Sequence, residues 1–217
     1  HLAPHTFIHP DDNKDGKEFP HLAFVDMEGQ GDDKGDDYEV ALSMPLLLTS
    51  KIVIYNVSED GVSTTHLKKL EVLTKAAKCL KGVDTDNPFG DLHIVWQKGL
   101  KSVTKEKVYN ELIKQKTPAE ISNIRNKRER RKAEKNNKIR EDLCKTFKSI
   151  TCWSLPNYKE SDENATVYQK EFQAMRNKML DQLKKPRKIP GTETDIITGD
   201  KMEPLFDQLL EGIKNRE

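Results

Sequence analysis

The feature that most constrains the fold is an apolar run that ends in an aspartate and leads into two glycines. Residues 22–25 contain no polar side chain, as is typical of a strand covered on both faces of a sheet. Asp26 follows directly, and Gly29 comes three residues later. Ligands of open α/β sheets bind beyond the carboxyl ends of the strands. A carboxylate there can hold Mg²⁺ through water, and a glycine lets a backbone N–H approach a phosphate. The pattern therefore predicts an α/β fold with such an edge.

The rest of the chain alternates between strand-like and helix-like patterns. Short runs rich in β-branched and aromatic residues predict strands, and apolar residues at helical spacing predict helices between them. We expect a mainly parallel sheet with helices on both faces. The predicted strands are residues 22–26, 51–56, 91–96 and 150–155, and the predicted helices are 38–50, 63–80, 105–116, 121–147, 167–184 and 202–214.

Three segments together resemble one protein family. The sequence Asp26-Met27-Glu28-Gly29-Gln30-Gly31-Asp32 resembles the D-[TM]-E-G-x-G-D switch segment of the guanylate-binding protein and atlastin group of large, dynamin-related GTPases. Residues 52–56 are similar to the S-[ST]-x-x-[IV]-[YF]-N strand of that group, and residues 150–156 to its I-x-C-[FW]-x-L-P segment. The matches follow in the same order along residues 22–213.

The resemblance implies a fold, a ligand and a set of site residues. The fold would be a three-layer, mainly parallel sheet of the P-loop GTPase type. GTP would be the ligand, and Asp26 would hold Mg²⁺ through water. Glu28 and Gly29 would serve catalysis, Gly29 would also contact the γ-phosphate, and the loop after Pro156 would help to cap the base. A cytoplasmic location and a nucleotide-dependent homodimer of the complete protein are further implications.

The sequence departs from the family at the base-reading motif. Gln97 and Lys98 follow the strand at 91–96, where the family has Arg-Asp. The family aspartate accepts two N–H bonds from guanine in a charge-assisted pair. A lysine side chain has no acceptor. We therefore expect poor discrimination of guanine from adenine.

The sequence also contains no G-x-x-x-x-G-K-[ST] loop, the element that cradles the phosphates of a P-loop GTPase. We interpret residues 1–217 as a partial GTPase domain, its second half, without the P-loop strand. Such a chain should not hydrolyse GTP by itself. The alternative is a degenerate, non-catalytic interaction module, which the Gln97-Lys98 pair favours and the retained Asp26 and Gly29 oppose.

Net charge, hydropathy and cysteine content indicate which partners and which cellular compartment to expect. The net charge of +1 gives no global field toward nucleic acid or membrane, so a nucleic-acid partner is not expected. No apolar run approaches the length of a bilayer span, so no membrane contact is expected through this segment. The three cysteines are odd in number and lack metal-like spacing, which favours reduced thiols in the cytosol.

Residues 118–148 stand out as a long basic helical insertion. Residues 125–140 hold nine basic and two acidic side chains and few apolar ones. A helix that is polar all round is exposed or bound to a partner. A solvated projection is the favoured interpretation, and a surface for RNA, anionic lipid or an acidic protein is the alternative. His93, within a predicted strand, is interpreted as a packed or half-exposed histidine rather than a catalyst.

Overall fold

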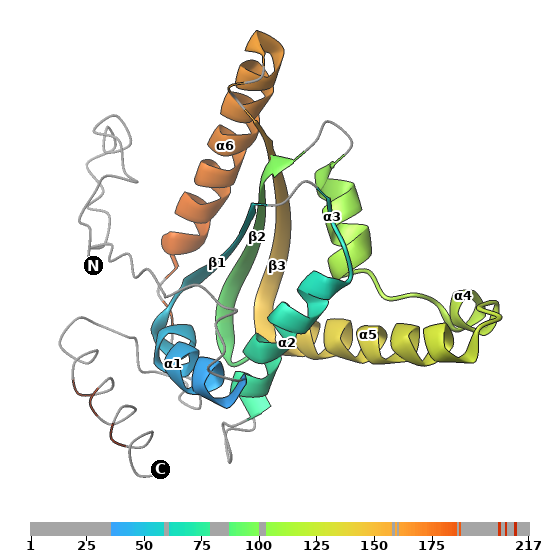
Figure 1. The fold of residues 1–217 in the computed structure, drawn as a ribbon. Coiled ribbons are helices and arrows are strands. Elements are labelled where there is room, and N and C mark those ends of the chain that lie inside the picture. Colours follow the sequence, from blue (N-terminus) through green and yellow to red (C-terminus); the bar gives the residue numbers. More distant parts are fainter. Residues whose placement is uncertain are drawn as a thin grey trace, which may run out of the picture.

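The computed structural model describes residues 36–58, 61–78, 87–99, 103–157, 159, 161–185 and 187, and the single positions 204, 207 and 211. Helices and strands alternate along this part of the chain (Figure 1). Their order is α1 (Asp36–Thr49), β1 (Ile52–Ser58), α2 (Thr65–Lys78), β2 (Phe89–Gly99), α3 (Lys105–Leu112), α4 (Pro118–Ser122), α5 (Lys127–Thr146), β3 (Phe147–Pro156) and α6 (Asp162–Leu183).

The three described strands form one parallel sheet in the order β1-β2-β3. Ile54 pairs with His93, and His93 pairs with Thr151, so one row of residues crosses all three strands. The predicted parallel arrangement is confirmed for these strands. The predicted strand at 22–26 lies outside the described residues, as does most of the predicted helix at 202–214.

Helices cover both faces of the sheet, which gives the three layers expected from the sequence (Figure 1). On one face, Leu92, Ile94 and Trp96 of β2 pack with buried residues of α1, α2, α3 and α5. Successive side chains of a strand point to opposite faces, so Val95 belongs to the other side. There it packs with residues of β3 and with Met175 and Met179 of α6.

One predicted helix is wrong in its extent. The single helix expected over residues 121–147 is divided into α4 and α5 by a turn at 123–126. Asn126 begins α5, because its side chain accepts hydrogen bonds from the N–H groups of Arg128 and Glu129. The guanidinium of Arg130 donates to the carbonyls of Ser122 and Ile124, which satisfies groups left open at the end of α4. Local capping therefore overrides the continuous polar pattern.

Several other element boundaries differ from the prediction. The helix expected over residues 105–116 ends at Leu112, and the strand expected from residue 150 begins at Phe147. The strand expected from residue 91 already begins at Phe89 and continues to Gly99. The helix expected from residue 167 begins at Asp162, where Ser161 is the N-cap and accepts from the N–H of Asn164. Ile139, Leu143 and Phe147 are buried, as predicted for the end of the long helix. In the described part of the chain, no helix is both long enough and apolar enough to cross a bilayer.

Candidate functional site at the carboxyl ends of the strands

The carboxyl ends of the three strands lie at one edge of the sheet, at the top of Figure 1. Ser58 at the end of β1 pairs with Gln97, and Gln97 pairs with Leu155 near the end of β3. Ser58 is exposed, Gln97 is half-buried and Leu155 is buried. Burial along this edge therefore increases from β1 to β3. In an open α/β sheet this edge is where a ligand would bind.

Lys98 occupies an irregular position of the ladder at this edge. Gln97 pairs with Leu155 and Gly99 pairs with Pro156, so the register shifts between Gln97 and Gly99. Lys98 is therefore an extra residue in β2, as in a β-bulge. Bulges bend the strand and are frequent beside active sites, where they redirect a side chain. The backbone at the expected base-reading position thus has a feature that is common at functional edges.

The segments that follow β2 and β3 meet at the same edge. Ser154 in β3 donates from Oγ to the carbonyl oxygen of Val103, at a distance of 2.5 Å. After Pro156 the chain turns into α6, and the buried Asn164 donates from Nδ2 to the carbonyl of Asn157 at 3.4 Å. These contacts hold the residues after both strands against the end of β3, which is the place of the expected base-capping loop.

The structure brings together only part of the predicted site. Gln97, Lys98 and Pro156 lie at the ends of adjacent strands, as a parallel sheet requires. Asp26, Glu28 and Gly29, the residues expected to hold Mg²⁺ and to serve catalysis, lie outside the described residues. Within the described ranges, no group of three His, Cys, Asp or Glu side chains is placed to hold a metal ion.

Sequence reasoning missed a chain of polar side chains between the sheet and α6. The indole Nε1 of Trp153 donates to Nδ1 of His93 at 2.9 Å, and His93 Nε2 lies 2.7 Å from Oε1 of Gln182. Gln182 donates from Nε2 to Ser149 Oγ at 3.3 Å, and Ser149 donates to Asp91 Oδ1 at 2.6 Å. Of the two predicted alternatives, packed or half-exposed, the structure shows the packed one, since His93 is fully buried, with partners from two other elements.

These hydrogen bonds determine the tautomer and the protonation state of His93. Nδ1 must accept from the indole, so the proton of the neutral ring is on Nε2 and is donated to Gln182. Burial lowers the pKa of His93, and Lys178 adds to the decrease, whereas the Gln182 bond and Asp91 oppose it. The neutral imidazole is a connector between sheet and helix, in the first half of β2 rather than at the candidate site.

A half-buried arginine lies at the opposite end of the sheet. Arg187 donates from Nη1 to the carbonyls of Leu47 and Ser50 and from Nη2 to that of Pro88, the last at 2.6 Å. Burial lowers its pKa to about 10, against the opposing charge of Asp91. Arg187, a short distance after α6, therefore joins the end of α1 to the start of β2. No sequence motif indicates this contact.

Comparison of the sequence with models of known protein families gave no match, and comparison with curated proteins gave none either.

Proposed function

We propose that this chain forms the base-binding part of a GTP-binding domain of the guanylate-binding or atlastin type, located in the cytoplasm. One observation carries the proposal: the bulged end of β2, with Gln97 and Lys98, lies beside Pro156 at the end of β3. The resemblance assigns base reading and base capping to these two strand ends. The sequence segment from Asp26 to Asp32 supports the proposal independently.

In this proposal the nucleotide binds along the carboxyl edge of the sheet. Asp26 would hold Mg²⁺ through water, Glu28 and Gly29 would serve the γ-phosphate, and the complete protein would dimerise when nucleotide binds. Gln97 offers one neutral amide oxygen to the base, while Lys98 offers only donors. The second candidate, a non-catalytic interaction module of the same fold, is favoured by this replacement of the base-reading aspartate.

Replacing Lys98 by aspartate should create a preference for guanine. We expect the unaltered chain to bind GTP and ATP within about tenfold of each other, because no carboxylate pairs with the two guanine N–H donors. The Lys98→Asp variant should favour GTP by about tenfold more, since one regained pairing contributes about 1–3 kcal/mol. Titration with fluorescent GTP and ATP analogues in the presence of Mg²⁺ measures both ratios.

Lys127→Asp is the matched control for this titration. It makes the same charge change at the exposed first residue of α5, where an acidic side chain suits a helix start. The nucleotide preference should not change in this variant. A proposal of base reading by β2 would be wrong if Lys98→Asp left the ratio of GTP to ATP affinity unaltered, or if neither nucleotide bound.

The chain by itself should release no phosphate from GTP. Its sequence offers no P-loop lysine or hydroxyl to cradle the phosphates and to place Mg²⁺. Phosphate release by the purified chain should therefore equal that of its Asp26→Ala variant. Mg²⁺-dependent release that is abolished by Asp26→Ala would contradict this expectation and would show that the phosphate site is built in another way.

A further inference from the structure

Charge is strongly segregated along this chain. Residues 114–138 hold ten basic and three acidic side chains, which gives this segment a net charge of +7. The net charge of the whole chain is only +1. The remaining residues therefore sum to −6. This basic segment comprises α4, the first part of α5 and the turns beside them, and it forms a projection that leaves the body of the molecule (Figure 1). The near-neutral total hides a local excess of positive charge.

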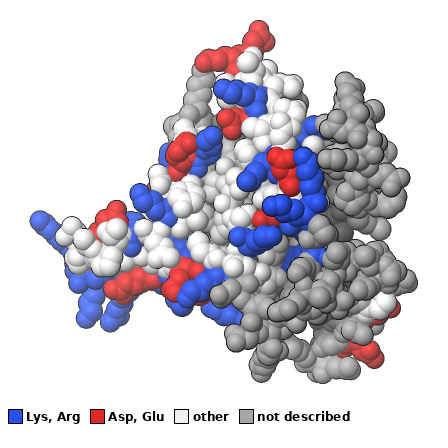
Figure 2. All heavy atoms as spheres, turned by 180° about the vertical axis from the view of Figure 1, so that it is seen from behind, with Lys and Arg blue, Asp and Glu red and all other residues white. Residues whose placement is uncertain are grey.

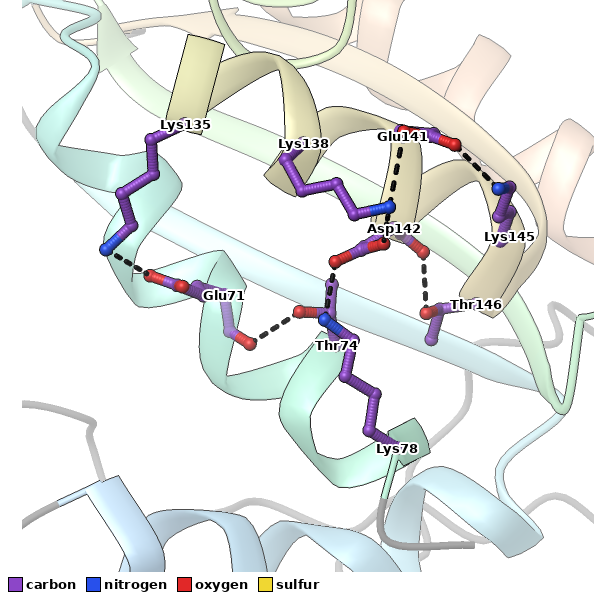
Figure 3. A network of polar contacts seen from close by, with 9 residues as sticks. All are labelled: Glu71, Thr74, Lys78, Lys135, Lys138, Glu141, Asp142, Lys145 and Thr146. Atoms are coloured by element: carbon purple, nitrogen blue, oxygen red, sulfur yellow. Dashed lines mark hydrogen bonds and ion pairs between the residues drawn. The ribbon is translucent and has the colours of Figure 1, made fainter. Parts of the chain in front are cut away.

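Three lysines of α5 that lie toward the body are already paired. Lys135 lies 3.8 Å from Glu71 of α2, and Lys138 lies 3.3 Å from Asp142. Lys145 lies 2.6 Å from Glu141, and all of these contacts belong to the network between α2 and α5 in Figure 3. These lysines connect helices or balance their own helix, so their charges are largely compensated.

The side chains at the far end of the projection are different. We use the name tip cluster for five exposed residues: Arg125, Lys127, Arg128, Arg131 and Lys132. None of the five makes an ion pair with another residue in the described ranges. Lys and Arg side chains are conspicuous at the end of the projection in Figure 2. Their charges are available to an external anion.

Hydrogen bonds hold the projection in a fixed shape behind the tip cluster. Asn137 of α5 and the backbone of Lys116 exchange two hydrogen bonds, of 2.9 and 2.7 Å. The buried Arg140 donates to the carbonyl of Glu111 at 2.7 Å, and Arg130 donates to the carbonyl of Ser122 at the end of α4. The side of α5 with Arg130 and Asn137 is therefore used for internal support, and the tip cluster belongs to another side.

The tip cluster has a regular spacing. Lys127 and Arg131 are four residues apart, as are Arg128 and Lys132, so each pair is separated by about 6 Å along the helix axis. At about 100° per residue the four side chains fall within an arc of about 140°. They form two short rows of cations along one side of a straight helix, and Arg125 lies just before the helix start.

The composition of this face decides between possible anionic partners. It has no aromatic or large apolar side chain, so it offers neither the aromatic anchors of a protein interface nor a platform for stacked bases. It also lacks the Trp, Phe or Leu side chains that insert between lipids in helices bound to a membrane surface. Each strand of a duplex carries one phosphate per about 3.4 Å of axis, so a row of cations about 6 Å long can meet more than one phosphate.

We propose that the tip cluster binds the phosphodiester backbone of a nucleic-acid duplex without reading its sequence. This departs from the expectation of no nucleic-acid partner, which rested on the net charge of the whole chain. Backbone binding needs only clustered Lys and Arg side chains, and arginine adds bidentate contacts to phosphate oxygens. The site is separate from the candidate nucleotide edge, since α5 leads directly into the amino end of β3.

The test is the salt dependence of binding to RNA and DNA duplexes of about 20 base pairs with identical sequence. The four side chains of the two rows, with one phosphate contact each, predict a slope of about −3.6 in log affinity against log salt. The affinity should therefore fall about 150-fold between 50 and 200 mM salt. The double variant Arg128→Gln, Arg131→Gln removes two contacts, so its loss should be only about 12-fold. Glutamine is also a good helix former, and circular dichroism checks that the fold is retained.

The double variant Lys138→Gln, Lys145→Gln is the matched control, because it removes the same charge from paired positions of α5. The duplex affinity of this control variant should still fall about 150-fold between 50 and 200 mM salt. An equal reduction of the slope in both variants would show that net charge rather than the tip cluster binds the duplex. Absence of duplex binding at 50 mM salt, or tighter binding to phosphatidylserine vesicles than to either duplex, would overturn the proposal.

Discussion

Replacing Gly90 by alanine should destabilise the protein by about 3 kcal/mol or more, because the added methyl group has no room. A Cβ at this position would lie 2.2 Å from the carbonyl oxygen of Lys51 and 2.7 Å from that of Ser50. Both atoms belong to backbone at the start of β1, where Asp91 N–H donates to Lys51 at 3.0 Å. The neighbouring strand would have to move, with loss of pairing.

Gly61→Ala is the matched control for this measurement. A Cβ at Gly61 would meet no atom within 4 Å, and the residue is exposed. We expect this variant to be neutral or more stable by up to about 1 kcal/mol, through the reduced entropy of the unfolded chain. Urea unfolding followed by circular dichroism gives both free energies. A Gly90→Ala variant as stable as Gly61→Ala would show that the two strands do not approach this closely.

The sheet could be predicted from sequence because strand patterning is a local property. Runs such as 52–56 and 150–155 contain the β-branched and aromatic residues that are enriched in strands. Helical patterns between the strands then require parallel pairing. This logic also places Gln97 and Pro156 at one edge, as the structure shows. The nucleotide itself stays a prediction, because its expected phosphate ligands lie outside the described residues.

The features that sequence reasoning missed depend on contacts between distant residues. His93, Ser149 and Gln182 are on three different elements, and nothing in their local sequence indicates that they meet. Arg140 belongs to the segment predicted to be an exposed basic helix, yet it is buried, and its guanidinium donates to the carbonyl of Glu111. The turn at 123–126 was the one local signal available, since Asn126 is a residue type that favours helix N-caps.

The buried position of His93 should make the protein sensitive to mild acid. Both ring nitrogens are occupied, and a proton on Nδ1 would face the N–H of Trp153. The folded pKa lies below the unfolded value of about 6.5, so the unfolded chain binds the proton first as the pH falls. The free energy of unfolding should therefore be fully retained above about pH 6.5 and should decrease below it. The loss is about 1.4 kcal/mol for each unit that separates the two pKa values.

His93→Gln separates this effect from the titration of carboxylates. The amide cannot be protonated in this range, and its N–H₂ can still donate to Gln182, while Trp153 loses its acceptor. The variant should be about 1–3 kcal/mol less stable at about pH 7.5. The difference should shrink toward about pH 5, because only the unaltered protein loses stability through His93 over this interval. Acidic groups affect both proteins alike, so they cancel in the comparison. Parallel stability profiles for the two proteins, or an imidazole pKa at or above 6.5 by NMR, would show that His93 does not connect the sheet to α6 in its neutral form.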